Sequence, residues 1–156
     1  MELYETLKNL GIEYEEISHK AIFTVAEALK EKIASRIEGT ECKNLFVKSK
    51  SRYYLIFLDA GKRADLKFLA RLAGESKLSF ASDDELNSVL NLEAGSVTPL
   101  GIINDSENKV TLLLDRELAG KRILVHPNTN TRTISISFDD LLKFISYTGH
   151  EYHLFP

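Results

Sequence analysis

Two short apolar runs separated by a polar turn constrain the fold of this chain more than any other part of its sequence. Residues 45–47 (Leu-Phe-Val) and 53–58 (Tyr-Tyr-Leu-Ile-Phe-Leu) flank the turn Lys50-Ser51-Arg52. Each run is too short for a typical helix, but has the length and the β-branched and aromatic content of a strand. The pattern therefore predicts a β-hairpin.

The rest of the chain predicts more strands than helices. Helices are expected at 3–10, closed by Gly11, from the capping residue Thr24 through Ile33, and at 65–73, 82–91 and 137–149. Strands are expected at 12–17, 77–81 and 131–137, and the apolar runs 100–103, 110–114 and 123–125 are counted with them. Because most strands follow one another through tight turns, we expect an α+β fold with a mixed, largely antiparallel sheet.

Length and composition indicate one domain covering residues 1–156, since a chain of this length can bury roughly two-thirds of its unfolded surface. The N-terminus lacks the basic flank and apolar core of a signal peptide, and no apolar run approaches the ~18 residues of a membrane span. The single cysteine, Cys42, excludes an intramolecular disulfide and suits a reducing compartment. We expect a soluble, cytoplasmic protein without a membrane partner.

The net charge of −3 conceals a basic segment. Residues 43–77 contain nine lysines and arginines but three acidic residues, so this segment carries +6 and the rest of the chain −9. A negative net charge and the lack of a helix-turn-helix signature argue against DNA binding. The basic residues are either solvated side chains or a face that holds a few phosphates of an RNA end, with Lys48, Lys50 and Arg52 as candidate contacts.

Familiar catalytic apparatus is absent from the sequence. No G-x-S-x-G motif occurs, and His150-x-x-His153 lacks a nearby third ligand, so no metal site is expected. Cys42 could be a nucleophile if Lys43 lowered its pKa, but a lone cysteine is more often a small buried apolar residue.

Polar residues do interrupt the strand pattern at three places. Lys43 and Asn44 stand at the start of the apolar run in Gly39-Thr40-Glu41-Cys42-Lys43-Asn44-Leu45-Phe46-Val47-Lys48. Two distant stretches accompany them: Gly95-Ser96-Val97-Thr98-Pro99 and His126-Pro127-Asn128-Thr129-Asn130-Thr131. Each has a plain structural explanation: a surface lysine, a turn asparagine, a turn held by glycine and proline, and a histidine bonded to backbone. Such departures from a local pattern also mark functional sites.

In this order the three stretches resemble the YbaK/prolyl-tRNA-synthetase-associated editing family, in its freestanding deacylase branch. The resemblance implies a curved sheet surrounded by helices and, with no cofactor, hydrolysis of mischarged aminoacyl-tRNA, above all alanyl-tRNA(Pro), by a positioned water. Lys43 matches the family's essential lysine and would contact either the phosphate beside the terminal adenosine or the ester carbonyl. Asn44 would hold the substrate.

The same resemblance assigns the other candidates. Gly95, Ser96, Val97, Thr98 and Pro99 would form a loop whose N–H groups face a sugar hydroxyl or an oxyanion. His126 and Asn130 would line the aminoacyl pocket, where His126 contacts the amino group or narrows the space. His19-Lys20-Ala21-Ile22-Phe23-Thr24 is similar to the family's H-P-P-x-F-T segment, with Lys20 and Ala21 in place of the prolines, and Thr24 would face the substrate as well as cap its helix.

The implied partner is the acceptor end of mischarged tRNA(Pro), and prolyl-tRNA synthetase is a candidate partner. The alternative is a non-catalytic module that binds a tRNA end or an aminoacyl-nucleotide through the same residues. A deacylation assay separates the two functions. The sequence leaves the edited amino acid and the oligomeric state open.

Overall fold

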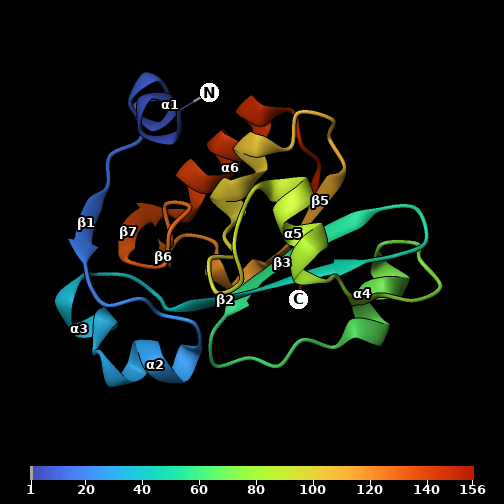
Figure 1. Cartoon of the computed structure of the whole chain (residues 1–156), viewed down its shortest axis with the longest axis horizontal. Coiled ribbons are helices and arrows are strands. Elements are labelled where there is room, and N and C mark those ends of the chain that lie inside the picture. The colour runs from blue at the N-terminus through green and yellow to red at the C-terminus, as the bar shows by residue number, and fades with distance from the viewer. Residues whose placement is uncertain (1) are drawn as a thin grey trace.

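The computed structural model of the chain, which describes residues 2–156, contains two β-sheets with helices around them (Figure 1). The smaller sheet is antiparallel and has the order β1 (Glu15–Ser18), β7 (Arg132–Ser137), β6 (Arg122–Val125). The larger sheet has the order β4 (Ser79–Phe80), β2 (Cys42–Lys48), β3 (Tyr53–Asp59), β5 (Val110–Asp115), β8 (Tyr152–Phe155). Strands β4, β2 and β3 pair antiparallel, whereas β3, β5 and β8 are parallel. The expected α+β class and mixed, largely antiparallel pairing are confirmed.

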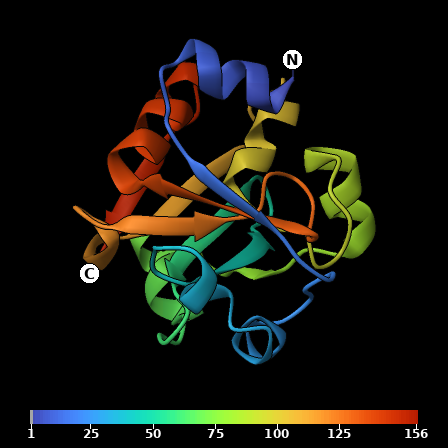
Figure 2. The same ribbon diagram turned by 90° about the vertical axis from the view of Figure 1, so that its left-hand side faces the viewer.

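A bridge at Thr40 connects the two sheets just before β2 begins. The N–H of Thr40 donates to the carbonyl of Arg122 at 2.9 Å, and the N–H of Leu124 donates to the carbonyl of Thr40 at 3.0 Å. Figure 2 shows the smaller sheet facing the viewer, with α2 (Val25–Lys30) and α3 (Ile33–Arg36) below it. The bridge holds the start of β2 beside β6, where the pocket described below lies.

The main core fills the space between the sheets. On β3, Leu55 and Phe57 face this core, while Tyr54, Ile56 and Leu58 face a second cluster on the opposite side. Because both faces of β3 are buried, its sequence is apolar throughout and does not alternate. The other helices are α1 (Leu3–Asn9), α4 (Leu66–Leu72), α5 (Asp83–Leu90), α6 (Phe138–Thr148) and the 3₁₀ turns η1 (Pro99–Asn104) and η2 (Arg116–Leu118). Helix α6 packs on the main core and α4 on the second cluster (Figure 1).

Three expected elements differ in the structure. The helix expected from Thr24 through Ile33 is divided into α2 and α3, because Lys32 adopts a left-handed conformation with φ of 54°. The run 100–103 forms η1 and no strand: Pro99 starts the turn and the Thr98 hydroxyl accepts from the N–H of Leu100. Strand β1 begins three residues later than expected, at Glu15. Strand β8 was not predicted at all. No helix within residues 2–156 is long and apolar enough to cross a membrane.

Candidate active site

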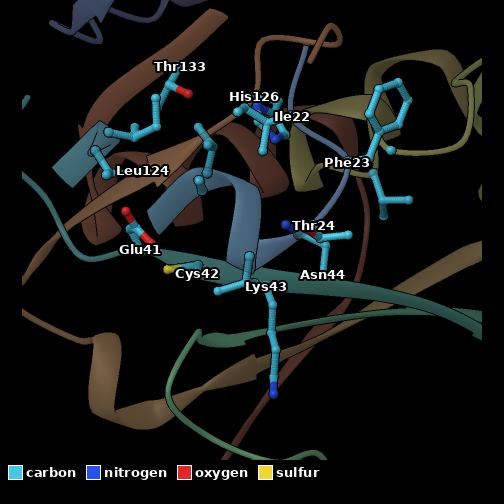
Figure 3. A pocket seen from close by; sticks show the side chains of 16 residues that line it. Ile22, Phe23, Thr24, Glu41, Cys42, Lys43, Asn44, Leu124, His126 and Thr133 are labelled. Atoms are coloured by element: carbon cyan, nitrogen blue, oxygen red, sulfur yellow. The ribbon is translucent and has the colours of Figure 1, made fainter. Parts of the chain in front are cut away.

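A pocket of about 220 Å³ lies where β2 begins beside the end of β6. Helix α2 and the segment before it border the pocket on one side, and the loop containing Gly95 borders it on another (Figure 3). Most of its wall is apolar. The lining residues are Ile22, Phe23, Thr24, Val25, Ala28, Ile33, Glu41, Cys42, Lys43, Asn44, Gly95, Val97, Leu124, Val125, His126 and Thr133.

Six of the residues singled out from the sequence line this pocket, although they come from four separate segments. They are Thr24, Lys43, Asn44, Gly95, Val97 and His126. The Thr24 hydroxyl accepts from the N–H of Glu27 at 3.1 Å, which anchors the start of α2 at the pocket. The fold therefore brings together residues from four segments that lie far apart in the sequence.

Four other substrate-binding candidates, Ser96, Thr98, Pro99 and Asn130, are not among the residues that line the pocket. The buried Thr98 donates its hydroxyl to the carbonyl of His126 at 2.7 Å, so it connects the Gly95 loop to the His126 loop. The carbonyl of Asn130 accepts from the N–H of Ile22 at 3.0 Å, and the N–H of buried Ser96 donates to Glu93. Pro99 is buried at the start of η1. Through these contacts the four residues hold in place the neighbouring residues that line the pocket.

Lys43 and Asn44 project to opposite sides of β2, as successive residues of a strand do. Figure 3 shows Asn44 on the side of Thr24, while the Lys43 side chain extends away from Thr24 and His126. The Oδ1 atom of Asn44 is buried and has no hydrogen-bond partner among the described residues. Lys43 is half-buried and forms no ion pair within residues 2–156. Both side chains are therefore available to a ligand.

The ring of His126 forms a hydrogen bond to the backbone that indicates which ring nitrogen carries the proton. Its Nδ1 lies 3.1 Å from the carbonyl of Arg132, which can only accept, so Nδ1 donates and Nε2 is left as an acceptor. Burial lowers the pKa of His126, and the nearby His19 lowers it further, which outweighs the bond to Arg132. The histidine is therefore neutral near pH 7.

Cys42 is positioned in the wall but lacks the character of a nucleophile. Its thiol donates to the carbonyl of Thr40 at 3.3 Å. Burial raises the pKa of this thiol well above its ordinary value, and Asp59 adds to the increase. Because the thiolate and not the thiol attacks, the thiol is inert at neutral pH.

Two further lining residues received no role from the sequence. Glu41 directly precedes β2, and its Oε1 is buried and without a partner in the described chain. Phe23 is 59% exposed at the pocket mouth, over Gly95. A Cβ atom on Gly95 would lie 2.4 Å from Cδ1 of Phe23, and the φ of Gly95 is +86°. Both the left-handed backbone and the close approach favour glycine there. In the sequence, Phe23 could have been singled out as an aromatic residue next to the capping threonine Thr24.

The three candidate phosphate contacts of the basic segment lie away from the pocket. Lys48, at the far end of β2 and about 17 Å from Lys43 along the strand, forms an ion pair with Glu85 at 2.8 Å. The Arg52 Nε donates to the hydroxyl of Thr111 at 2.6 Å. Lys50, at the exposed tip of the hairpin, has no such partner within the described residues. It is therefore the member of the trio most available for a phosphate.

No cluster of three or more metal-binding side chains occurs in the part of the chain that the structure describes. His150, one of the two histidines near the C-terminus, is buried and its Nε2 lies 2.9 Å from Oδ2 of Asp105. The same carboxylate accepts from the N–H groups of Lys109 and Val110. This pair joins the loop before β5 to the turn after α6.

Comparison with known proteins places the chain among editing domains. Residues 19–144 match the family model of the aminoacyl-tRNA editing domain. The chain is 38% identical over 149 residues to the prolyl-tRNA editing protein ProX of Acetoanaerobium sticklandii, covering 94% of this chain and 90% of the relative. It is 39% identical over 153 residues to the prolyl-tRNA synthetase associated domain-containing protein 1 of Danio rerio, covering 96% and 82%. A crystal structure described as a candidate trans-editing enzyme for prolyl tRNA synthetase superposes with a TM-score of 0.73 at 22% identity, covering 97% and 92% of the two chains.

Proposed function

Because the chain belongs to the aminoacyl-tRNA editing domain family, we propose that it is a trans-editing aminoacyl-tRNA deacylase whose main substrate is alanyl-tRNA(Pro). Two curated relatives carry names that refer to prolyl-tRNA editing or prolyl-tRNA synthetase, and each matches more than nine-tenths of this chain. The resemblance seen in the sequence motifs is thereby confirmed at the level of the family. The amino acid, the mechanism and the residues that follow are our proposal.

The observation that carries the choice of alanine is the mostly apolar lining of the pocket of about 220 Å³, which suits a small apolar aminoacyl group better than a polar one. A synthetase pocket built for proline cannot strongly reject the smaller alanine, because each missing methylene is worth only ~1–3 kcal/mol. A second pocket that accepts a methyl group and excludes a pyrrolidine ring removes alanine and spares proline. Val97, Val125 and His126 supply walls suited to this exclusion.

Water is the proposed nucleophile. An aminoacyl ester is already activated, so an oriented water together with electrostatic stabilisation can hydrolyse it without a covalent intermediate. The protonated Cys42 thiol fits this assignment. Gly95 and Val97 line the pocket, and we propose that backbone N–H groups of their loop donate to the oxyanion or to the ribose, while the neutral His126 offers an acceptor. The 2′-hydroxyl of the terminal ribose would help to orient the water.

The tRNA end would bind around the pocket mouth. Exposed Phe23 offers an aromatic face on which the terminal adenine can stack. Lys43, whose ammonium points away from the pocket, suits the phosphate beside that adenosine better than it suits the ester carbonyl. Lys50 would contact a phosphate further along the acceptor stem. Prolyl-tRNA synthetase is a proposed partner, because it produces the mischarged tRNA.

A deacylation assay with purified protein tests the proposal. Labelled alanyl-, cysteinyl-, seryl- and prolyl-tRNA(Pro) are compared at equal concentration, and we expect alanyl-tRNA(Pro) to be hydrolysed fastest and prolyl-tRNA(Pro) to be spared. Faster hydrolysis of the cysteinyl or seryl ester would reassign the substrate. Tight binding of the tRNA end without hydrolysis of any ester would favour the non-catalytic alternative.

A further inference from the structure

Glu41 is a pocket residue whose carboxylate has an unmet hydrogen-bonding requirement. Its Oε1 atom is buried, and its side chain forms neither a hydrogen bond nor an ion pair within residues 2–156. Glu41 as a whole is half-buried. A buried carboxylate oxygen without a partner is nevertheless costly, so such an atom often marks a place where a ligand or water completes the bonding. Glu41 lies at the start of β2, on the pocket side of Cys42 (Figure 3).

The polar atoms around this pocket are mainly acceptors. Besides Glu41, the buried Oδ1 of Asn44 has no partner in the described chain, and Nε2 of His126 is an acceptor because Nδ1 carries the proton. A ligand that satisfies these atoms must bring N–H or O–H donors.

The electrostatic environment at this end of the pocket is negative. Burial is the main reason why the pKa of Cys42 is raised, but the charges of Asp59, Asp115 and Glu41 raise it further. Lys62 neutralises Asp115 through an ion pair at 2.8 Å, whereas Glu41 forms no ion pair with any described residue. Among the described lining residues, Lys43 is the lysine or arginine present, and its ammonium points away from the pocket. A positively charged donor is therefore the ligand group that fits beside Glu41.

We propose that Glu41 binds the α-ammonium group of the aminoacyl ester and makes a free amino terminus a condition for hydrolysis. This inference rests on the proposed deacylase function and adds to it a selection that pocket size alone does not provide. An α-ammonium has three N–H donors and a positive charge, which match a carboxylate. An aminoacyl ester whose nitrogen is acylated, as in peptidyl-tRNA, lacks the positive charge, and its acyl group would not fit beside Glu41. The enzyme would therefore spare it.

The test is a double-mutant cycle between the protein and the substrate. Wild-type protein and Glu41→Gln are each assayed on alanyl-tRNA(Pro) and on the lactyl ester, in which a hydroxyl replaces the ammonium. Wild type should prefer the alanyl ester about ten- to hundredfold, the range expected for a hydrogen bond to a charged group. Glu41→Gln should lose most of that preference, chiefly by slowing hydrolysis of the alanyl ester. Glu38→Gln, the same change at an exposed position three residues earlier, should behave as wild type.

Binding provides a readout that does not depend on turnover. The Kd values of the non-hydrolysable amide analogues of alanyl- and lactyl-adenosine should show the same pattern, with the preference for the charged analogue present in wild type and reduced in Glu41→Gln. Equal losses on both esters would overturn the assignment and make Glu41 a base or a structural residue, as would an unchanged preference. If wild type hydrolyses no ester, the deacylase proposal fails, and the two analogues still decide the role of Glu41.

Discussion

Replacing Lys43 by methionine tests whether its ammonium binds a phosphate of the tRNA end. The side chain extends from the pocket-bordering start of β2 to the side of the strand opposite Asn44, and forms no ion pair within the described chain. Methionine keeps an unbranched stem of similar length and removes the charge, so folding stability should change by no more than about 0.5 kcal/mol.

The size of the effect of Lys43→Met on substrate binding follows from Coulomb's law and from the exposure of Lys43. Two unit charges 4 Å apart interact with about 1 kcal/mol in water and about 4 kcal/mol at the effective dielectric constant near a protein surface. Because Lys43 is half-buried and partly screened, we expect the lower part of this range, about 1–2 kcal/mol. Hydrolysis of alanyl-tRNA(Pro), measured as kcat/KM, should therefore fall roughly five- to thirtyfold.

The assay compares alanyl-tRNA(Pro) with alanyl-adenosine, which has the ester but no phosphate. Lys43→Met should slow only the first reaction and make its salt dependence shallower by about one log–log unit or less. Lys8→Met, the same substitution at an exposed position of α1, serves as the control. An equal loss of activity on both substrates would refute the phosphate assignment and place the ammonium at the ester carbonyl.

Four other predictions follow from the same geometry. His126→Ala should shift the preference from alanyl- toward prolyl-tRNA(Pro) by about tenfold or more, because a ring is removed from the wall; an unchanged substrate profile would put His126 outside the pocket. Cys42→Ala should remain active, since the buried thiol stays protonated, and a thioester trapped on the wild-type protein would contradict this. Lys50→Met should weaken binding of tRNA but spare alanyl-adenosine; equal damage to both would place Lys50 in the fold or the pocket. Lys48, followed by the N–H of Ser82 and the Tyr53 hydroxyl, lowers the pKa of Glu85 to about 2. This pKa lies below the ordinary pKa of about 4.3 for a glutamate. The ionised Glu85 therefore stabilises the folded state above about pH 4.3, and this stabilisation is lost as the pH falls toward 2. In urea unfolding, the stability difference between wild type and Glu85→Gln should therefore shrink between pH 7 and about pH 3, and a constant difference would refute the ion pair's role.

Local sequence was sufficient wherever local interactions decide the structure. The hairpin of β2 and β3 is confirmed because its two apolar runs and polar turn leave few alternatives. The capping box of Ser82 and Glu85 begins α5 as expected, and Gly149 ends α6 in a left-handed conformation. The residues Lys43 and Asn44 could be noticed from the sequence because polar groups at the start of an apolar strand break its pattern.

Local sequence patterns could not predict contacts between segments that are distant in the sequence. Strand β8 is short and half-exposed, and it is a strand because β5 offers it a parallel edge. Lys48 and Arg52 were candidates for phosphate contacts, and nothing in the sequence indicated that residues 37 and 59 positions away supply internal partners for them.

The sequence by itself determined the hairpin, the helix caps and the family motifs, since each depends on neighbouring residues and their intrinsic preferences. Only the tertiary structure decided that Thr24, Asn44, Gly95 and His126 share one pocket. It also decided that Glu41 lines this pocket without a partner for its buried oxygen among residues 2–156, although its local sequence is typical of a solvated loop. The physical reason is that burial and charge pairing depend on which segments pack together, and here the bridge at Thr40 brings β2 against β6.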